Sequence, residues 1–346
     1  MRVAALTLVV ALSVACARSH PAPVSKPPAR SVLDELRDDA RTLHSYVHTP
    51  WVARWLSATD ALKSIGVRVV HHDAAKSVYY DEASFAALPQ AQRAGLIRQE
   101  VSDQEYYANV TSPLEYARAF DLLGEAGLDG VAARRVFDFG YGNATALRML
   151  ASLGADANGV EVDPLLPALY SSPGDQGVVS GIGGAPSGKL RLFHGRFPED
   201  AALTSAIASG YDLVISKNTL KNGYLHPERP VEPRHRIDLG VPDEEFVRDL
   251  FAMLKPGGLA MLYNICPPPN APGKPYLPWA DGRSPFPQSM LKSAGFVVVA
   301  FDRDDSAALH AMGHLLRWDL EDEGYDIDGD RASYTLLRRP LVDASR

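Results

Sequence analysis

The sequence predicts an α/β protein built on a doubly wound, mostly parallel β-sheet. Residues 135–164 contain a strand, a glycine turn, a helix and a second strand in succession. Short apolar runs then alternate with helical patterns along the rest of the chain. The chain has 346 residues, 46% hydrophobic and 22% charged, which suits one large domain with an appendage.

The first residues have the pattern of an export signal. Arg2 precedes an apolar run, 3–14, which is too short to span a bilayer and has the length of a signal-peptide core. Small residues and then Cys16 end the run, as at the cleavage site of bacterial lipoproteins. We expect residues 1–16 to be a signal peptide with a lipobox-like end and residues 17–30, rich in proline, to be a linker. A hydrophobic anchor and a misassigned start codon are the alternatives.

Residues 31–110 are predicted to form a helical N-terminal extension. Ser31 has capping-box spacing and begins an amphipathic helix, and a second helix carries Trp55 and continues to Ile65. Two short extended runs follow, and then a polar helical stretch that reaches Arg98.

The sequence His71-His72-Asp73 lies between the two extended runs. Adjacent histidines cannot both be presented on one helical face, which disfavours a metal site. We interpret the three residues as a solvated turn and expect no metal site in the chain.

Residues 111–346 are predicted to form the main domain, which begins with a capped helix at Ser112. Its organising stretch, 135–164, has the pattern of a βαβ unit that binds a nucleotide-like ligand. A buried strand, 136–139, leads into the glycine turn and a helix that Gly154 ends. Later strands are expected at 190–194, 211–216, 259–264, 296–301 and 334–338, with helices at 243–254 and 306–318.

The glycine turn and the end of the second strand predict how that ligand would be held. Gly140 and Gly142 have no Cβ, so their backbone can approach a ligand closely. Glu161 lies 23 residues beyond Asp138 at the tip of the adjacent strand, where a carboxylate can accept both hydroxyls of a ribose. Thr145 occupies the third glycine position of the dinucleotide fingerprint, which disfavours a pyrophosphate ligand.

The turn resembles motif I of the class I S-adenosylmethionine-dependent methyltransferases, since Asp138 to Gly142 follow the pattern D-x-G-x-G. The segments 211–216, 254–259 and 293–296 resemble the family's strand 4 and its entries to strands 5 and 6. The resemblance covers roughly residues 112–340. It implies a Rossmann-like sheet of seven strands in which the last strand is antiparallel and pairs with strand 6.

The resemblance also implies that the protein binds S-adenosylmethionine. Gly140 and Gly142 would pass under the amino-acid part of the cofactor, and Glu161 would bind its ribose. The family's acidic residue after strand 3 is replaced by Arg196, which cannot accept a hydrogen bond from the adenine amino group. The expected cofactor-binding residues are Asp138, Gly140, Tyr141, Gly142, Asn143, Glu161, Gly195, Arg196 and Ser216.

The acceptor side is predicted from the long loop that follows residue 216. Its lysines, arginines and histidines would suit an anionic acceptor, although such a loop can also be simply solvated. Lys217 and Asn218 are expected to orient a small-molecule acceptor, and His226 is the predicted base, because its pKa range suits proton removal near neutrality. The net charge of −7 disfavours a nucleic-acid partner.

The predicted function is therefore methyl transfer from S-adenosylmethionine to a small molecule. An aminopropyltransferase of the same fold is a second interpretation. The sequence favours it less, because residues 216–218 lack the paired acids of such enzymes. A catalytically idle lipoprotein that uses the fold as a binding module is the alternative from another class. The export signal favours this alternative, because the cofactor is made in the cytoplasm.

Replacing Cys16 with serine tests the predicted location, an exported protein held by lipid on the periplasmic side of a bacterial membrane. The variant should leave the membrane fraction, because a lipid anchor would attach the chain without a spanning helix. Fractionation and mass spectrometry of the N-terminus check this. A native chain that retains Met1 and stays in the cytoplasm would contradict the export prediction.

Overall fold

The structure, a computed structural model, describes residues 30–109, 111–318 and 325–341. The predicted signal peptide with Cys16, and the linker as far as residue 29, lie outside the described residues. None of the helices in the described part has the length and apolar character needed to cross a membrane.

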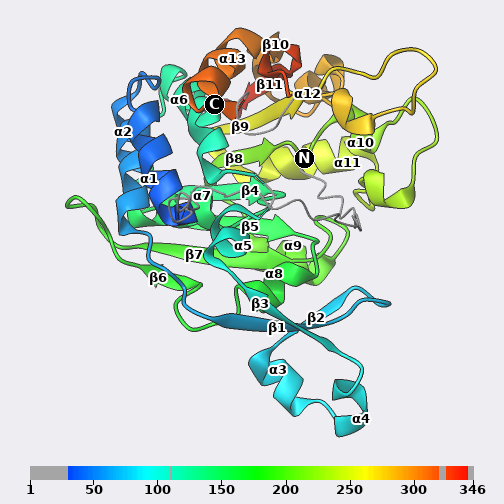
Figure 1. Cartoon of the computed structure of the whole chain (residues 1–346). Coiled ribbons are helices and arrows are strands. Elements are labelled where there is room, and N and C mark those ends of the chain that lie inside the picture. The colour runs from blue at the N-terminus through cyan, green and yellow to red at the C-terminus, as the bar shows by residue number, and fades with distance from the viewer. Residues whose placement is uncertain (1–29, 110, 319–324, 342–346) are drawn as a thin grey trace, which may run out of the picture.

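A mostly parallel sheet forms the centre of the main domain (Figure 1). The last strand runs antiparallel to both of its neighbours, as predicted. The sheet has eight strands rather than seven, because a short strand in the glycine-rich segment before residue 188 adds an antiparallel edge. The strand order is β10 (Val297–Asp304), β11 (Arg331–Arg338), β9 (Leu254–Cys266), β8 (Tyr211–Lys217), β4 (Arg135–Phe139), β5 (Asp156–Glu161), β7 (Gly188–His194) and β6 (Gly177–Val179).

Hydrophobic cores lie on both faces of this sheet, which explains why its central strands direct apolar side chains to both faces. Every residue of β8 is buried, with Leu213 and Ile215 in one core and Val214 in the other. The first core contains α1 (Val32–Leu43), α2 (Pro50–Ser57), α6 (Tyr116–Glu125), α7 (Thr145–Ser152), α8 (Leu165–Leu169) and α13 (Ser306–Leu315), and the second contains α9 (Ala201–Ile207), α10 (Asn222–Leu225), α11 (Asp243–Met253) and α12 (Gln288–Ser293).

The N-terminal extension contains a three-stranded sheet as well as helices. The two extended runs predicted there form strands, whereas the end of the predicted polar helical stretch, at Arg98, lies in a third strand. Strands β2 (Val78–Asp81), β1 (Arg68–Asp73) and β3 (Ile97–Val101) form an antiparallel sheet in that order. Helices α3 (Glu82–Ala87) and α4 (Gln90–Arg93) project with it below the main domain in Figure 1, and α5 (Asp103–Ala108) leads back. We call residues 68–101 the N-terminal arm.

Two local predictions in this region were wrong. His71 and His72 lie in β1 rather than in a solvated turn, and the buried His71 ring stacks on Phe85 with the centroids 3.5 Å apart. The helix expected up to Ile65 ends earlier, at Ser57, and is followed by a 3₁₀ turn, Ala58–Ala61.

A buried ion pair fixes the arm to the main domain. The Arg68 guanidinium donates to both oxygens of Asp175, at 2.6 and 2.8 Å. The hydroxyl of Tyr106 on α5 donates to the same carboxylate at 2.8 Å, and Arg68 lies over the Tyr106 ring. Moving β1 away from Asp175 would leave a charge buried without its partner, which is costly. The ion pair therefore fixes the position of the arm on the main domain.

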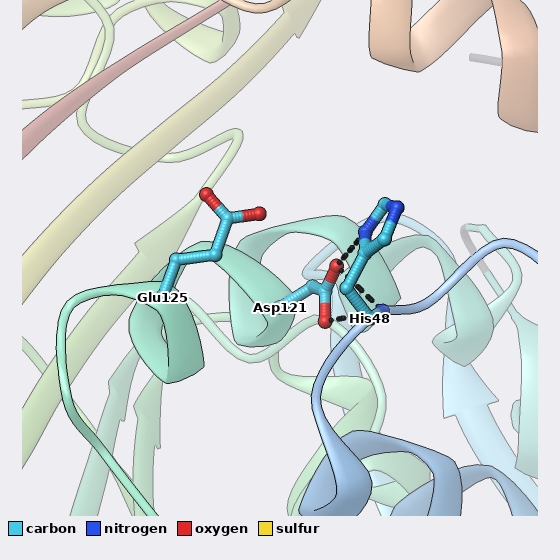
Figure 2. Close-up of side chains that lie close together, drawn as sticks. All are labelled: His48, Asp121 and Glu125. Atoms are coloured by element: carbon cyan, nitrogen blue, oxygen red, sulfur yellow. Dashed lines mark hydrogen bonds and ion pairs between the residues drawn. The ribbon is translucent and has the colours of Figure 1, made fainter.

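Helix α6 is held by a group of charged and polar side chains that Figure 2 shows. The fully buried Asp121 accepts hydrogen bonds from the backbone N–H groups of His48 and Thr49 and from the Thr49 hydroxyl. The possible ligand atoms of His48, Asp121 and Glu125 lie within 4.8 Å of one another. Because Asp121 is saturated with donors and Glu125 pairs with Arg118, we assign this group a structural role.

Candidate functional site

The carboxyl ends of β4, β5 and β8 meet at one edge of the sheet, where an open α/β fold binds its ligands. Asp138 lies near the end of β4 with only 1% of its surface exposed. Its Oδ2 accepts a hydrogen bond from the Tyr116 hydroxyl at 2.7 Å. Its Oδ1 has no hydrogen-bond partner among the described residues, so this buried acceptor is left unsatisfied by the protein.

Burial raises the pKa of the Asp138 carboxyl to about 7. The Tyr116 hydrogen bond and the positive charge of Lys217 oppose this rise in pKa, whereas the negative charge of Glu161 adds to it. The carboxyl can therefore change its protonation state near neutral pH.

The two glycines of the turn occupy different environments. Gly140 has a φ of +80°, and a Cβ there would collide with the Thr219 side chain, whose hydroxyl donates to the Gly140 carbonyl at 3.3 Å. Gly142 has a φ of +59°, and a Cβ there would meet no atom within 4 Å. The Thr219 side chain thus fills the space beside Gly140, whereas the space beside Gly142 is open.

Tyr141 and Asn143 support the turn from within. The Tyr141 ring is buried against the backbone of Gly159, a position where a Cβ would clash with it. The Asn143 side chain donates to the Thr111 carbonyl at 3.2 Å and accepts the N–H of Thr145 at 3.2 Å. Both side chains therefore shape the loop.

Glu161 ends β5 as predicted and is partly exposed. Burial raises the pKa of its carboxyl, while the backbone N–H groups of Val162 and Asp163 lower it. Glu161 and Asp138 influence each other electrostatically, so the structure brings the predicted ribose-binding acid and the motif I acid to the same edge.

The remaining predicted cofactor residues differ in accessibility. Gly195 follows β7 with a φ of +140°. Arg196 is exposed, and its guanidinium lies 3.4 Å from Glu199. The Ser216 hydroxyl is buried near the end of β8 and accepts the N–H of Leu220 at 3.2 Å.

The three predicted catalytic residues lie in three different settings. The Lys217 ammonium is buried, pairs with Glu115 and lies 5.4 Å from the centre of the Tyr116 ring. Asn218 has a φ of +62°, and its side-chain oxygen accepts the N–H of Ile265 at 2.7 Å, so it holds the backbone. His226 lies beyond α10, is 44% exposed and pairs with Asp243 at 2.8 Å.

A second buried lysine lies on the same loop. The Lys221 ammonium donates to the Ile265 carbonyl, and the buried Cys266 thiol is beside it. Burial lowers the pKa of Lys221 and raises the pKa of Cys266. The nearby Cys266 in turn raises the pKa of Lys221, and the nearby Lys221 lowers the pKa of Cys266. Among the described residues, no carboxylate forms an ion pair with Lys221.

The predicted site residues did not include Glu115, Tyr116, Thr219 and Lys221. A signal was present for the first two, because the capped helix start at Ser112 places both at the start of a helix that leads to β4. Lys221 belongs to the basic loop predicted to face the acceptor, but only the folded loop shows that it and Thr219 turn inward.

A cavity of about 850 Å³ lies at the opposite edge of the sheet. It is lined by residues of α2, of the loop before β4 and of the loop between β6 and β7. None of the predicted site residues lines it, and it is separate from the edge where Asp138 and Glu161 meet.

The chain matches no protein-family model and no curated protein. Similar solved structures include phosphoethanolamine N-methyltransferase 2 from Haemonchus contortus in complex with S-adenosylmethionine, which is 12% identical, with 89% of this chain and 83% of that chain covered and a TM-score of 0.40. Geranyl diphosphate C-methyltransferase from Streptomyces coelicolor A3(2) is 14% identical over 65% and 79%, with a TM-score of 0.38. An S-adenosylmethionine-dependent methyltransferase from Mesorhizobium loti is 16% identical over 64% and 98%, with a TM-score of 0.35. This likeness is one of fold alone.

Replacing Asp138 with asparagine tests the state of the buried carboxyl. Because its pKa rises from 3.8 to about 7 on folding, the native state binds more protons between these values, and stability falls as the pH increases through that range. The wild-type free energy of unfolding, relative to that of Asp138→Asn, should fall by about 4 kcal/mol at most between pH 4 and 7. Denaturant unfolding at several pH values measures this difference, and parallel curves would contradict the raised pKa.

Proposed function

We propose that this protein is an S-adenosylmethionine-dependent methyltransferase acting on a small, anionic molecule. The observation that carries the proposal is the buried, unpartnered Oδ1 of Asp138 at the edge where β5 presents Glu161. An orphaned acceptor in such a place is costly unless a ligand or a water satisfies it. The open space at Gly142 lies on the same turn.

Four of the predicted cofactor residues fit this ligand. The Glu161 carboxylate would accept the ribose hydroxyls, and Asp138 would accept a donor of the cofactor. Gly142 leaves room for the cofactor beside the turn, whereas Tyr141 would act by keeping the turn in shape. When bound, the cofactor would supply an electrophilic methyl group on a sulfonium.

The chain's own task would be to align the acceptor and, where needed, to remove its proton. Lys217 and Lys221 place two ammonium groups near the end of β8, and only Lys217 has a carboxylate partner among the described residues. Burial disfavours the charged form of Lys221, and an anionic ligand beside it would stabilise that form, which supports an acceptor with a carboxylate or phosphate group. His226, oriented by Asp243, is the proposed base.

A binding module without catalysis is the second candidate, and the Thr219 side chain favours it. Thr219 lies where a Cβ of Gly140 would be, so part of the room that the glycine provides is taken by the protein. Titration of the purified chain with S-adenosylmethionine and with S-adenosylhomocysteine separates the two candidates. No binding of either would contradict the methyltransferase proposal.

Replacing Glu161 with alanine tests the cofactor site. Hydrogen bonds to a charged acceptor contribute about 1.5–3 kcal/mol each, so loss of the carboxylate should weaken S-adenosylhomocysteine binding by about tenfold or more. Glu35→Ala is the matched control, because this exposed acid lies on α1 and pairs with none of the predicted site residues. Calorimetry measures both affinities. Equal binding by the wild type and Glu161→Ala would exclude the proposed contact while leaving cofactor binding intact.

Replacing His226 with glutamine tests the proposed base once screening with labelled cofactor has found an acceptor. Turnover should fall by about a hundredfold, while cofactor affinity stays within a few-fold, because a base acts only in the transition state. Asp243→Asn should reduce turnover less, since it only orients the ring. His44→Gln is the control, as this residue caps α1 elsewhere. Unchanged turnover in His226→Gln would place the base outside this loop.

A further inference from the structure

Strand β3 of the N-terminal arm is an edge strand with one free side. It pairs with β1 and with no other described strand, so alternate N–H and C=O groups point away from the sheet. Exposed edges are commonly protected by charged side chains, proline, a β-bulge or a very short strand. Ile97–Val101 is short, contains no proline and has an unshifted register with β1, so its protection comes from its length and from Arg98 and Glu100.

The same strand is complementary in charge to a second copy of itself. Arg98 and Glu100 flank Gln99, and their side chains are 54% and 63% exposed. If two copies align antiparallel with Gln99 opposite Gln99, Arg98 of each copy lies opposite Glu100 of the other. Ile97, which is 51% exposed, then lies opposite Val101.

The charges also disfavour other alignments of the two strands. A shift that places Arg98 opposite Arg98, or Glu100 opposite Glu100, brings like charges together, which destabilises a strand pair. A parallel in-register alignment opposes the same like charges. A slip by one residue turns the exposed side chains to the wrong face. Only the antiparallel alignment centred on Gln99 pairs both charges in both copies.

We propose that the β3 edge is the surface through which two copies of this chain associate around a twofold axis at Gln99. The two three-stranded sheets then form one continuous sheet, with the same patch used by both copies. Figure 1 shows the arm projecting away from the main sheet. In the single chain, Arg98 and Glu100 pair with each other at 2.9 Å, and in the dimer each pairs with the other copy. This interface is small, so the dimer is weak and depends on concentration.

Charge reversal and its rescue test this interface. Sedimentation velocity of the full chain, in non-ionic detergent so that the apolar run 3–14 does not drive association, should show a dimer with a Kd below about 1 mM. Arg98→Glu or Glu100→Arg alone should raise the Kd by about tenfold or more, because both create like-charge pairs. The double variant Arg98→Glu, Glu100→Arg restores opposite charges and should return the Kd to within about threefold of the wild type.

Lys76→Glu is the matched control, since it reverses an exposed charge in the β1–β2 turn and should leave the Kd unchanged. A chain that is monomeric up to about 1 mM would overturn the proposal. So would a dimer that Arg98→Glu does not weaken, or one that the double variant does not restore. These outcomes do not depend on cofactor binding, so they leave the proposed function untouched.

Discussion

The hydrogen bonds that surround the buried Asp121 carboxylate are the interaction on which the rest of the structure depends. A carboxylate in the protein interior is stable only when donors replace the lost water. The donors here come from His48 and Thr49, in the connection between α1 and α2. Gly124 leaves the space that Thr49 occupies, since a Cβ there would collide with it. One charge on α6 thus fixes where the first two helices cover the sheet.

With α6 held in this way, its other polar side chains reach two separate regions. Arg118 donates to both oxygens of Asp305, which also accepts from the Tyr263 hydroxyl on β9. Two residues earlier, Tyr116 donates to Asp138 at the proposed cofactor edge. The helix before the first parallel strand therefore joins the C-terminal part of the sheet to the candidate site.

The main domain was predictable because its elements repeat one pattern under one constraint. Strands buried on both faces are mostly apolar, and a βα turn that needs positive φ favours glycine, as at Gly140 and Gly142. The N-terminal arm was predictable only in part. Its first two strands were expected as extended runs, but in β3 three polar residues separate Ile97 from Val101, a pattern that also fits a helix. The pairing of this stretch with β1, which is distant in the sequence, makes it a strand rather than a helix.

The candidate site was predictable only for residues whose role follows from the backbone. Asp138 and Glu161 end parallel strands, so their place at one edge follows from the topology. Asn218 was expected to face an acceptor, yet its side chain accepts the N–H of Ile265. A polar residue after a strand can serve either a ligand or the neighbouring backbone, and only the fold decides between them. Lys221 lies three residues farther along the same loop and is buried without a carboxylate partner among the described residues. Two cations of the loop, Lys217 and Lys221, are thus buried, while His226 stays at the surface.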